Sequence, residues 1–469
     1  MRSQHKIQIV TALAGALALS ACVTHKYTPP APAAANVYRD TTVTDSTSLA
    51  DVPVTQLFTD TILQNLIAEG IRESYDLKTA VQRIAEADAT LRQSRAAYLP
   101  TLSGGPQVTR AKQSAAGLNF PPEFASSFNL TTTTYQLGLS ASWEADIWGK
   151  LSSTKRAAFA NLLKSEAARR AVQTQLIADI ATNYYSLLAL DKQLAITEET
   201  VKNRITDMET MKALKESAVV NGAAVVQSEA NRYAAEVTIP DLKRSIRETE
   251  NALSILLARQ PGTIKRTTLA EQNPYTNLML GVPSQLLKNR PDVQQAELTF
   301  RAAFENVNVA RTYFYPSLTI SGQGGASALK IKDLFEHSIF YNVVGGITQP
   351  IFNQGQNKAR LRIAKAQQQE AFYGFQQSLL TAGQEVSNAL YAYQTAVDKQ
   401  GSRDKQLRAL EKSVDYTKDL LRYSSATNYT DVLTSEQSLL SAQLSSVNDR
   451  LQQLQAVVSL YHALGGGWK

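Results

Sequence analysis

One stretch of this chain constrains its fold more than any other. Between Tyr135 and Ile147 the odd-numbered residues are all apolar, and none of the even-numbered residues is a large apolar one. Side chains alternate between two faces along a β-strand, so the segment predicts a strand with one apolar and one polar face. Strands of soluble sheets usually run about five or six residues, whereas a strand that crosses a bilayer needs roughly 9–11. This long alternation, with Trp143 and Trp148 towards one end, is typical of a membrane barrel strand.

The chain also repeats itself once. In each half a helical stretch ends at a proline, Pro100 or Pro316, and an alternating segment begins there. Proline stops a helix and is tolerated at the first residue of a strand. A loop and a return strand follow, which predicts one β-hairpin in each half. We expect the hairpins at about 100–148 and 316–353, with the second return strand at about 339–351.

Long helices are predicted after each hairpin. The segment from Gln356 to Tyr423 has no proline, and as one helix it is on the order of 100 Å long. Near the C-terminus apolar residues recur at alternating steps of four and three. This spacing places them in one line along a helix, where another helix can pack. The residues are Leu440, Leu444, Val447, Leu451, Leu454, Val458 and Tyr461. We therefore predict two repeats, 59–265 and 266–469, and a frayed tail after the glycines that end the last helix.

The strand count has a consequence for assembly. Each chain offers four long amphipathic strands, and an open sheet edge is not tolerated in lipid. The smallest known closed membrane barrels use about eight strands, so this chain must pool its strands with copies of itself. The predicted fold is mainly α-helical with a membrane β-barrel, and a trimer gives the barrel twelve strands.

The N-terminus has the features of a targeting segment over residues 1–21. Arg2 and Lys6 form a positive region, and the apolar run that follows is too short for a transmembrane helix. Cys22 is the only cysteine, so neither an intramolecular disulfide nor a multi-cysteine metal site can form. Residues 22–58 begin with a segment rich in Pro, Ala, Thr and Ser, which predicts an extended tether.

Several kinds of function find no support in the sequence. The formal charge of +7 comes without a block of Lys or Arg, so a nucleic-acid partner is not indicated. The four histidines are scattered, and no phosphate-binding or cofactor motif is present. We therefore predict no catalytic site, no metal and no cofactor, and the chain is not expected to be an enzyme.

Three local motifs give a family resemblance. Leu19-Ser20-Ala21-Cys22 resembles a bacterial lipobox, and Arg290-Pro291-Asp292 followed by Ala296-Glu297 resembles a characteristic helix start. Pro291 suits the first turn of a helix, and Asp292 complements the helix dipole there. The ending Tyr461-His462-Ala463-Leu464-Gly465-Gly466-Gly467-Trp468 is very like the sequence YKALGGGW. With the duplicated hairpins, the set resembles the TolC-like outer-membrane factors, in the lipoprotein branch that serves multidrug efflux pumps.

The resemblance implies a location and partners. It implies cleavage before Cys22, which becomes an N-palmitoyl, S-diacylglycerol cysteine; several acyl chains hold a protein stably where one does not. An ordinary signal peptide is the alternative. It further implies a homotrimer whose barrel lies in outer-membrane lipid and whose helices form a periplasmic tunnel. A periplasmic adaptor protein and a proton-driven inner-membrane pump would be its partners.

The implied function is that of a passive duct in a tripartite efflux system. It would export small molecules such as drugs and toxic compounds. One alternative is a channel of the same fold that secretes proteins or peptides. Another is a periplasmic coiled-coil lipoprotein that only scaffolds the envelope, but this leaves the long alternating segments unexplained.

The resemblance also points to candidate site residues at a helical turn. Family members carry an aspartate-bearing motif around the periplasmic aperture, and the matching stretch here contains Asn428, Asp431 and Thr434. Asp431 falls on an acidic position, whereas Thr434 stands where many members have a second aspartate. Three close carboxylates in a trimer would bind cations and select against anions. Asp431 as the cap of the following helix is the other interpretation, and both can hold.

A second turn, 207 residues earlier in the sequence, matches the first one. Its small residues, Gly222 and Ala223, together with Ala426 of the first turn, are expected to permit tip-to-tip packing. We predict that these residues form the helix tips to which the adaptor docks.

Overall fold

The computed structural model describes residues 24–30, 38, 47–114, 117, 129–282, 284–423 and 428–469. The predicted signal peptide, Cys22 and Ala426 lie outside these ranges. The chain divides into two compact units. The sheet unit comprises Ile84–Lys164, Glu297–Tyr373 and the N-terminal residues up to Pro30; the helix unit comprises Ala31–Arg83, Ser165–Ala296 and Gly374–Lys469.

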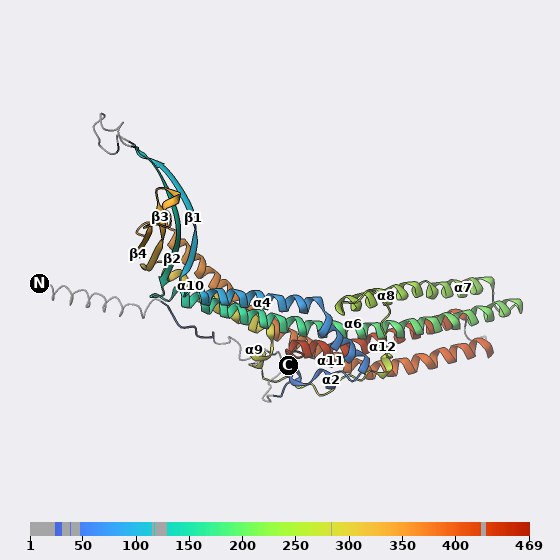
Figure 1. Ribbon diagram of the computed structural model, residues 1–469. Coiled ribbons are helices and arrows are strands. Elements are labelled where there is room, and N and C mark those ends of the chain that lie inside the picture. Colours follow the sequence, from blue (N-terminus) through green and yellow to red (C-terminus); the bar gives the residue numbers. More distant parts are fainter. Residues whose placement is uncertain are drawn as a thin grey trace. The chain divides into compact units, whose positions relative to one another are not determined.

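The sheet unit contains a four-stranded antiparallel sheet in the order β1-β2-β3-β4 (Figure 1). The strands are β1 (Thr101–Lys112), β2 (Thr131–Ala145), β3 (Ser317–Ala328) and β4 (Ile339–Thr348). Each strand is paired with the next along the chain, so β1 and β4 are the two edges. The predicted hairpins are thus joined side by side through β2 and β3.

The register separates the two faces as the alternation predicted. Gln107 pairs with Gln136, and Gln323 pairs with Asn342, so the amide side chains share one face. The opposite face carries exposed apolar side chains: Leu102, Val108, Leu137, Leu139, Tyr341, Val343 and Ile347. A sheet with this composition has one face suited to water and one suited to lipid.

The strand ends differ from prediction for local reasons. β2 begins at Thr131, four residues earlier than expected, because a run of β-branched threonines continues the ladder. It ends at Ala145, because the Asp146 carboxylate accepts hydrogen bonds from the backbone N–H groups of Leu151 and Ser152, at 2.8 and 2.9 Å. β4 ends at Thr348, shortly before Pro350, which cannot donate to a ladder.

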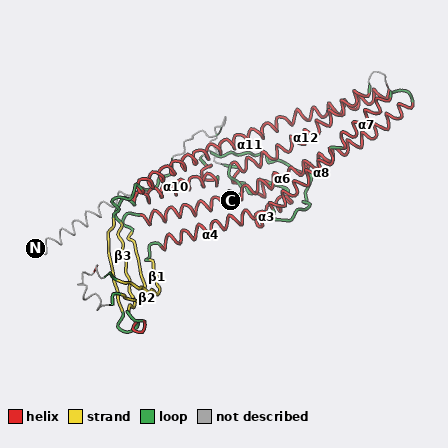
Figure 2. The backbone as a smooth tube through the Cα atoms, turned by 90° about the horizontal axis from the view of Figure 1, so that it is seen from above, coloured by secondary structure: helices red, strands yellow, loops and turns green. Residues whose placement is uncertain are grey.

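Long helices make up most of the remaining structure (Figure 2). They are α3 (Thr61–Glu73), α4 (Tyr75–Ala96), α6 (Lys150–Glu216), α7 (Gly222–Glu236), α8 (Thr238–Leu256), α10 (Pro291–Thr312), α11 (Gln356–Tyr423) and α12 (Tyr429–Ala463). Shorter helices are η2 (Leu49–Asp51), α2 (Val54–Leu57), η4 (Leu269–Glu271), α9 (Gln285–Asn289) and η5 (Ile331–Asp333). The predicted bounds of α11 are confirmed. Of the helices in the described ranges, none is both long and apolar enough to cross a membrane.

The core of the helix unit lies along the predicted seam of α12. Val447, Leu454, Val458 and Tyr461 are buried in it, and the seam leucines Leu440, Leu444 and Leu451 pack against it. The heptad prediction is therefore confirmed. Burial of these side chains stabilises the helices far more than their intrinsic propensity does.

The two sequence motifs of the helix unit meet in one joint. The Arg290 side chain is only 4% exposed, and its Nε and Nη2 donate to the two oxygens of Asp292 at 2.9 and 2.6 Å. Its Nη1 donates to the Ala463 carbonyl at 3.0 Å and pairs with Glu385. Arg290 thus joins the start of α10 to α11 and to the end of α12.

The glycine-rich tail completes this joint, so the prediction of a frayed end was wrong. Gly465, Gly466 and Gly467 are buried, and Trp468 Nε1 donates to the Asn289 carbonyl at 2.8 Å. Gly465 has φ +83°, and a Cβ there would lie 2.3 Å from the Asn289 oxygen. The tail is fixed because its glycines let the backbone approach closely.

Candidate functional site

The first candidate region is the turn that leads into α12. Asn428 Oδ1 accepts from the Asp431 backbone N–H at 3.2 Å, and the Asn428 N–H donates to Asp431 Oδ2 at 3.3 Å. This reciprocal pair is a capping box in which Asn428 is the N-cap residue and Asp431 is the third residue of the helix. Asp431 therefore takes part in the cap, but it is not itself the N-cap residue. Asn428, Asp431 and Thr434 are all exposed in the single chain, and the Thr434 hydroxyl bonds back to the Thr430 carbonyl at 2.8 Å.

The matching turn leads into α7 and is built in a similar way. Asn221 caps α7 by accepting from the Ala224 N–H at 3.1 Å, as Asn428 caps α12. The third helical position is Ala224 here and Asp431 in the other turn. An acidic residue therefore stands at this position only in the second-half turn.

Gly222 and Ala223 are exposed at the start of α7. A Cβ on Gly222 would meet only the Lys215 Cε atom, at 3.9 Å, which is ordinary contact. Nothing within the chain therefore requires a glycine at this position. The third predicted tip residue, Ala426, lies outside the described residues.

Below the two turns an apolar cluster joins the helices. Met211, Tyr429 and Val432 form its buried part, and Ala224 and Leu421 are among the half-buried side chains that pack on it. The cluster takes residues from α6, α7, α11 and α12. It gives the two turns a common base within the helix unit.

A charged cluster lies next to this base. Lys418 Nζ on α11 is 2.5 Å from Glu436 Oε1 on α12 and 3.4 Å from Asp207 Oδ1 on α6. Burial raises the pKa of Glu436, and Asp207 adds to the effect although Lys418 opposes it. Burial lowers the pKa of Lys418, but the ion pairs outweigh it and the net shift is upward. The cluster has two carboxylates for one ammonium group.

The sequence patterns indicate no role for Lys418, Glu436 or Asp207. One local signal for Asp207 exists, because it lies four residues before the buried Met211 and so on the same helix face. The pairing itself joins three helices that are far apart in the sequence. No periodicity of a single segment reveals such a contact.

The N-terminal segment that follows Cys22 is docked in the sheet unit. The Tyr27 ring packs against Phe300 and Phe304 of α10, with ring centroids 6.0 and 5.6 Å apart. The His25 N–H donates to Asn308 Oδ1 at 3.1 Å, and Asn308 Nδ2 donates to the His25 carbonyl at 3.0 Å. We call residues 24–30 the strap. The predicted tether is therefore held against α10 at His25 and Tyr27.

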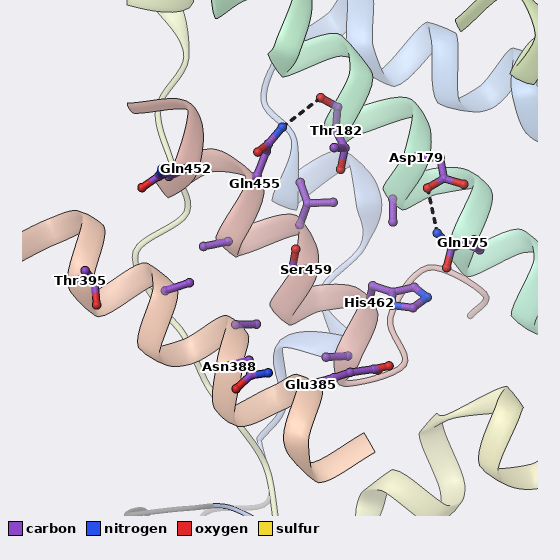
Figure 3. Close-up of a pocket in the computed structure, with 16 residues that line it drawn as sticks. Gln175, Asp179, Thr182, Glu385, Asn388, Thr395, Gln452, Gln455, Ser459 and His462 are labelled. Atoms are coloured by element: carbon purple, nitrogen blue, oxygen red, sulfur yellow. Dashed lines mark hydrogen bonds between the residues drawn. The ribbon is translucent and has the colours of Figure 1, made fainter. Parts of the chain in front are cut away.

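A groove of about 650 Å³ with a mixed polar and apolar lining lies within the helix unit, between α6, α11 and α12 (Figure 3). Its polar lining consists of Gln175, Asp179, Thr182, Glu385, Asn388, Thr395, Gln452, Gln455, Ser459 and His462. Gln175 Nε2 donates to Asp179 Oδ1 at 2.8 Å, and burial lowers the pKa of His462. Within the described ranges no three His, Cys, Asp or Glu side chains are placed to hold a metal. The groove offers hydrogen-bonding groups to water or to a polar solute.

Known proteins share this sequence and this fold. A family model described as outer membrane efflux protein matches residues 66–259 and 282–466. The pyoverdine export outer membrane protein OpmQ of Pseudomonas putida is 32% identical over 460 residues, which cover 97% of this chain and 96% of that protein. The cation efflux system protein CusC of Escherichia coli is 30% identical over 417 residues, 87% of this chain and 88% of that one.

Solved structures agree with these relatives. A crystal structure of CusC superposes with a TM-score of 0.82 at 26% identity, covering 95% of this chain and 99% of that one. The open state of the Neisseria gonorrhoeae MtrE outer membrane channel gives 0.82 at 27% identity, covering 95% and 98%. The predicted resemblance and the mainly helical fold with its sheet are confirmed, whereas the repeat boundaries at 59–265 and 266–469 stay predictions. The chain belongs to the outer membrane efflux protein family, whose members are transport channels and not enzymes.

Proposed function

We propose that three copies of this chain form a passive duct through the outer membrane. The observation that carries the proposal is the four-stranded sheet with two open edges, β1 and β4, and an apolar face of exposed side chains. Unpaired backbone groups in lipid cost several kcal/mol each, so the edges must be paired. Three sheets joined edge to edge give a closed barrel of twelve strands.

The helices would continue the duct into the periplasm and close it there. In a trimer the exposed carboxylate of Asp431 occurs three times, with Asn428 and Thr434 beside it. Asp431 can take part both in the cap and in such a ring, because a carboxylate has two oxygens and about four acceptor sites. A ring of three carboxylates would favour cations and disfavour anions at the aperture.

The helix tips would be the docking surface for a periplasmic adaptor. Gly222 and Ala223 are exposed and small, and together with Ala426 they would let helices of a partner approach closely. The adaptor would link the duct to a proton-driven pump in the inner membrane. Small molecules are the cargo class that we assign, in line with relatives named for pyoverdine export and cation efflux.

A lipid anchor would hold the N-terminus to the membrane. The lipobox predicts acylation of Cys22, and the strap begins two residues later, at Thr24. The strap is fixed to α10 by Tyr27 and His25. The acyl chains would therefore enter the membrane at a defined place beside the sheet unit.

Single-channel conductance in a planar bilayer tests this function. Purified wild type is compared with Asp431→Asn, which removes the charge, and with Glu411→Gln, an exposed charge change on α11. We expect a cation-selective current in the wild type and in the Glu411→Gln protein, and reduced selectivity in Asp431→Asn. A folded, inserted protein that carries no current, even after Asp431→Asn, would contradict the duct. A current that is indifferent to Asp431 would leave that residue only its cap.

A further inference from the structure

The apolar face of the sheet ends in a basic group of side chains. Four rows of the β1–β2 ladder on this face are free of charge: Leu102 with Ala141, Gly104 with Leu139, Pro106 with Leu137, and Val108 with Tyr135. The next two rows pair Arg110 with Thr133 and Lys112 with Thr131. Two cations and two hydroxyls thus follow directly on the apolar band, on the same face. We call these four residues the basic rim.

The distance between the basic rim and Trp143 matches the thickness of the apolar layer of a membrane. The row of Arg110 lies ten residues along β2 from Trp143, the aromatic residue at the other end of the apolar face. Ten residues span about 33 Å along a strand, or about 25 Å along the membrane normal at the usual tilt of barrel strands. The apolar band of membrane barrels is about 25 Å tall. Trp143 and the basic rim therefore mark the two interfaces.

The two cations of the basic rim, Arg110 and Lys112, are exposed. All of β1 is exposed, and neither Arg110 nor Lys112 forms an ion pair with an acidic residue in the part of the chain that the structure describes. A lipid-facing cation is costly at the centre of a bilayer but nearly free of cost at its surface. Arginine and lysine side chains about 7 Å apart on one strand face, with threonine hydroxyls beside them, suit phosphate oxygens.

We propose that the basic rim binds the phosphate groups of lipid headgroups in the outer leaflet of the outer membrane. The inference rests on the proposed function, which places the helices in the periplasm and the hairpin loops towards the exterior. At that end of the sheet the lipid-facing side chains of β1 would reach the headgroup layer. The pairing is between two cations of one strand and an anionic, phosphorylated lipid, and the neighbouring Tyr135 would rest at the same interface.

Lipid retention measured by native mass spectrometry tests the proposal. The intact protein is reconstituted into nanodiscs that contain either bisphosphorylated lipid A or the same lipid after removal of its phosphates. The variant is Arg110→Gln with Lys112→Gln. The matched control, Lys405→Gln with Arg408→Gln, removes two exposed cations from α11, and so makes the same charge change away from the sheet.

We expect the wild type and the control to retain the phosphorylated lipid. The basic-rim variant should retain it on the order of tenfold less, and the dephosphorylated lipid should show no such difference. Equal retention by the wild type and the basic-rim variant would overturn the inference, as would an equal loss in the control. The same spectra give the number of protein copies. An inserted trimer without lipid preference overturns this inference alone, whereas a protein that does not insert overturns the proposed function with it.

Discussion

At the scale of single residues, Arg290 does more for the fold than its place in a short motif suggests. It is nearly completely buried, and its planar guanidinium group serves Asp292, Glu385 and the Ala463 carbonyl together. Burial of an arginine is tolerated only when its donors are satisfied in this way. In the sequence the motif indicates only the start of a helix. In the structure its first residue, Arg290, joins α10, α11 and α12.

Replacement of this arginine by lysine should therefore be destabilising although the charge is kept. A lysine ammonium group cannot donate two parallel hydrogen bonds to the two Asp292 oxygens, as the planar guanidinium group does. The charge-assisted hydrogen bonds that are lost stabilise the fold by roughly 1.5–3 kcal/mol. Chemical unfolding of the detergent-purified protein checks this for Arg290→Lys. Arg72→Lys is the control, because Arg72 is 70% exposed beside Glu73 and should change little. Equal midpoints for the two variants would contradict the role given to Arg290.

Two glycines offer a second matched pair. Gly465→Ala places a Cβ 2.3 Å from the Asn289 oxygen at a positive φ, which should cost at least about 1–3 kcal/mol. Gly222→Ala meets nothing closer than 3.9 Å and should leave stability unchanged or slightly raised, since alanine favours a helix. Thermal unfolding by circular dichroism compares them. A stable Gly465→Ala protein would show that the tail is not held as described.

At the scale of elements, the charged cluster under the tip predicts a pH dependence. The pKa of Glu436 is raised by burial, so the folded state binds its proton more readily than the unfolded state does. Stability then falls as pH rises through the folded pKa. Conversely, the tip should become more stable as the pH falls from neutral towards the ordinary glutamate value of 4.5.

Hydrogen exchange measures this effect locally. Protection of the peptide that spans residues 428–436, corrected for intrinsic rates, should rise on acidification in the wild type. It should rise less in Glu436→Gln, which has no proton to bind. Glu411→Gln on the exposed face of α11 serves as the control. An identical response in Glu436→Gln and the wild type would show that another group causes the pH dependence.

The strap gives an element-scale prediction that proteolysis can check. Trypsin cleaves after Lys26, which precedes the docked Tyr27 ring. Tyr27→Ala removes packing worth about 1.5–3 kcal/mol, so cleavage at Lys26 should be at least roughly tenfold faster. Tyr27→Phe keeps the ring and loses only the 3.4 Å hydrogen bond to Glu297, and should behave almost like the wild type. Equal cleavage of all three proteins would mean that the ring does not hold the strap.

The elements themselves could be predicted from the sequence because they depend on local periodicity. The alternation around Trp143 predicted β2, and the steps of four and three predicted the buried seam of α12. What could not be predicted depends on contacts between distant segments. The joint at Arg290, the docking of the strap and the cluster at Lys418 each join residues from separate elements. No pattern within one segment encodes such contacts.

At the scale of the whole molecule, the duplication has produced two halves that are similar in form and different in chemistry. Asn221 and Asn428 cap equivalent helices, yet only the second turn carries an acid, Asp431, at the third position. In the proposed trimer six tips would thus alternate between uncharged and acidic. Both kinds would offer small residues to an adaptor, and only the second would add a carboxylate for the control of ion passage.

In the proposed duct, other copies of the chain close the open edges of β1 and β4. Native mass spectrometry of the full-length protein, extracted in mild detergent, measures this most directly. We expect a single species of three copies, which persists in Cys22→Ala because the strands and not the lipid hold it together. A folded monomer that is stable in detergent, or a dimer, would contradict it, since neither supplies twelve strands.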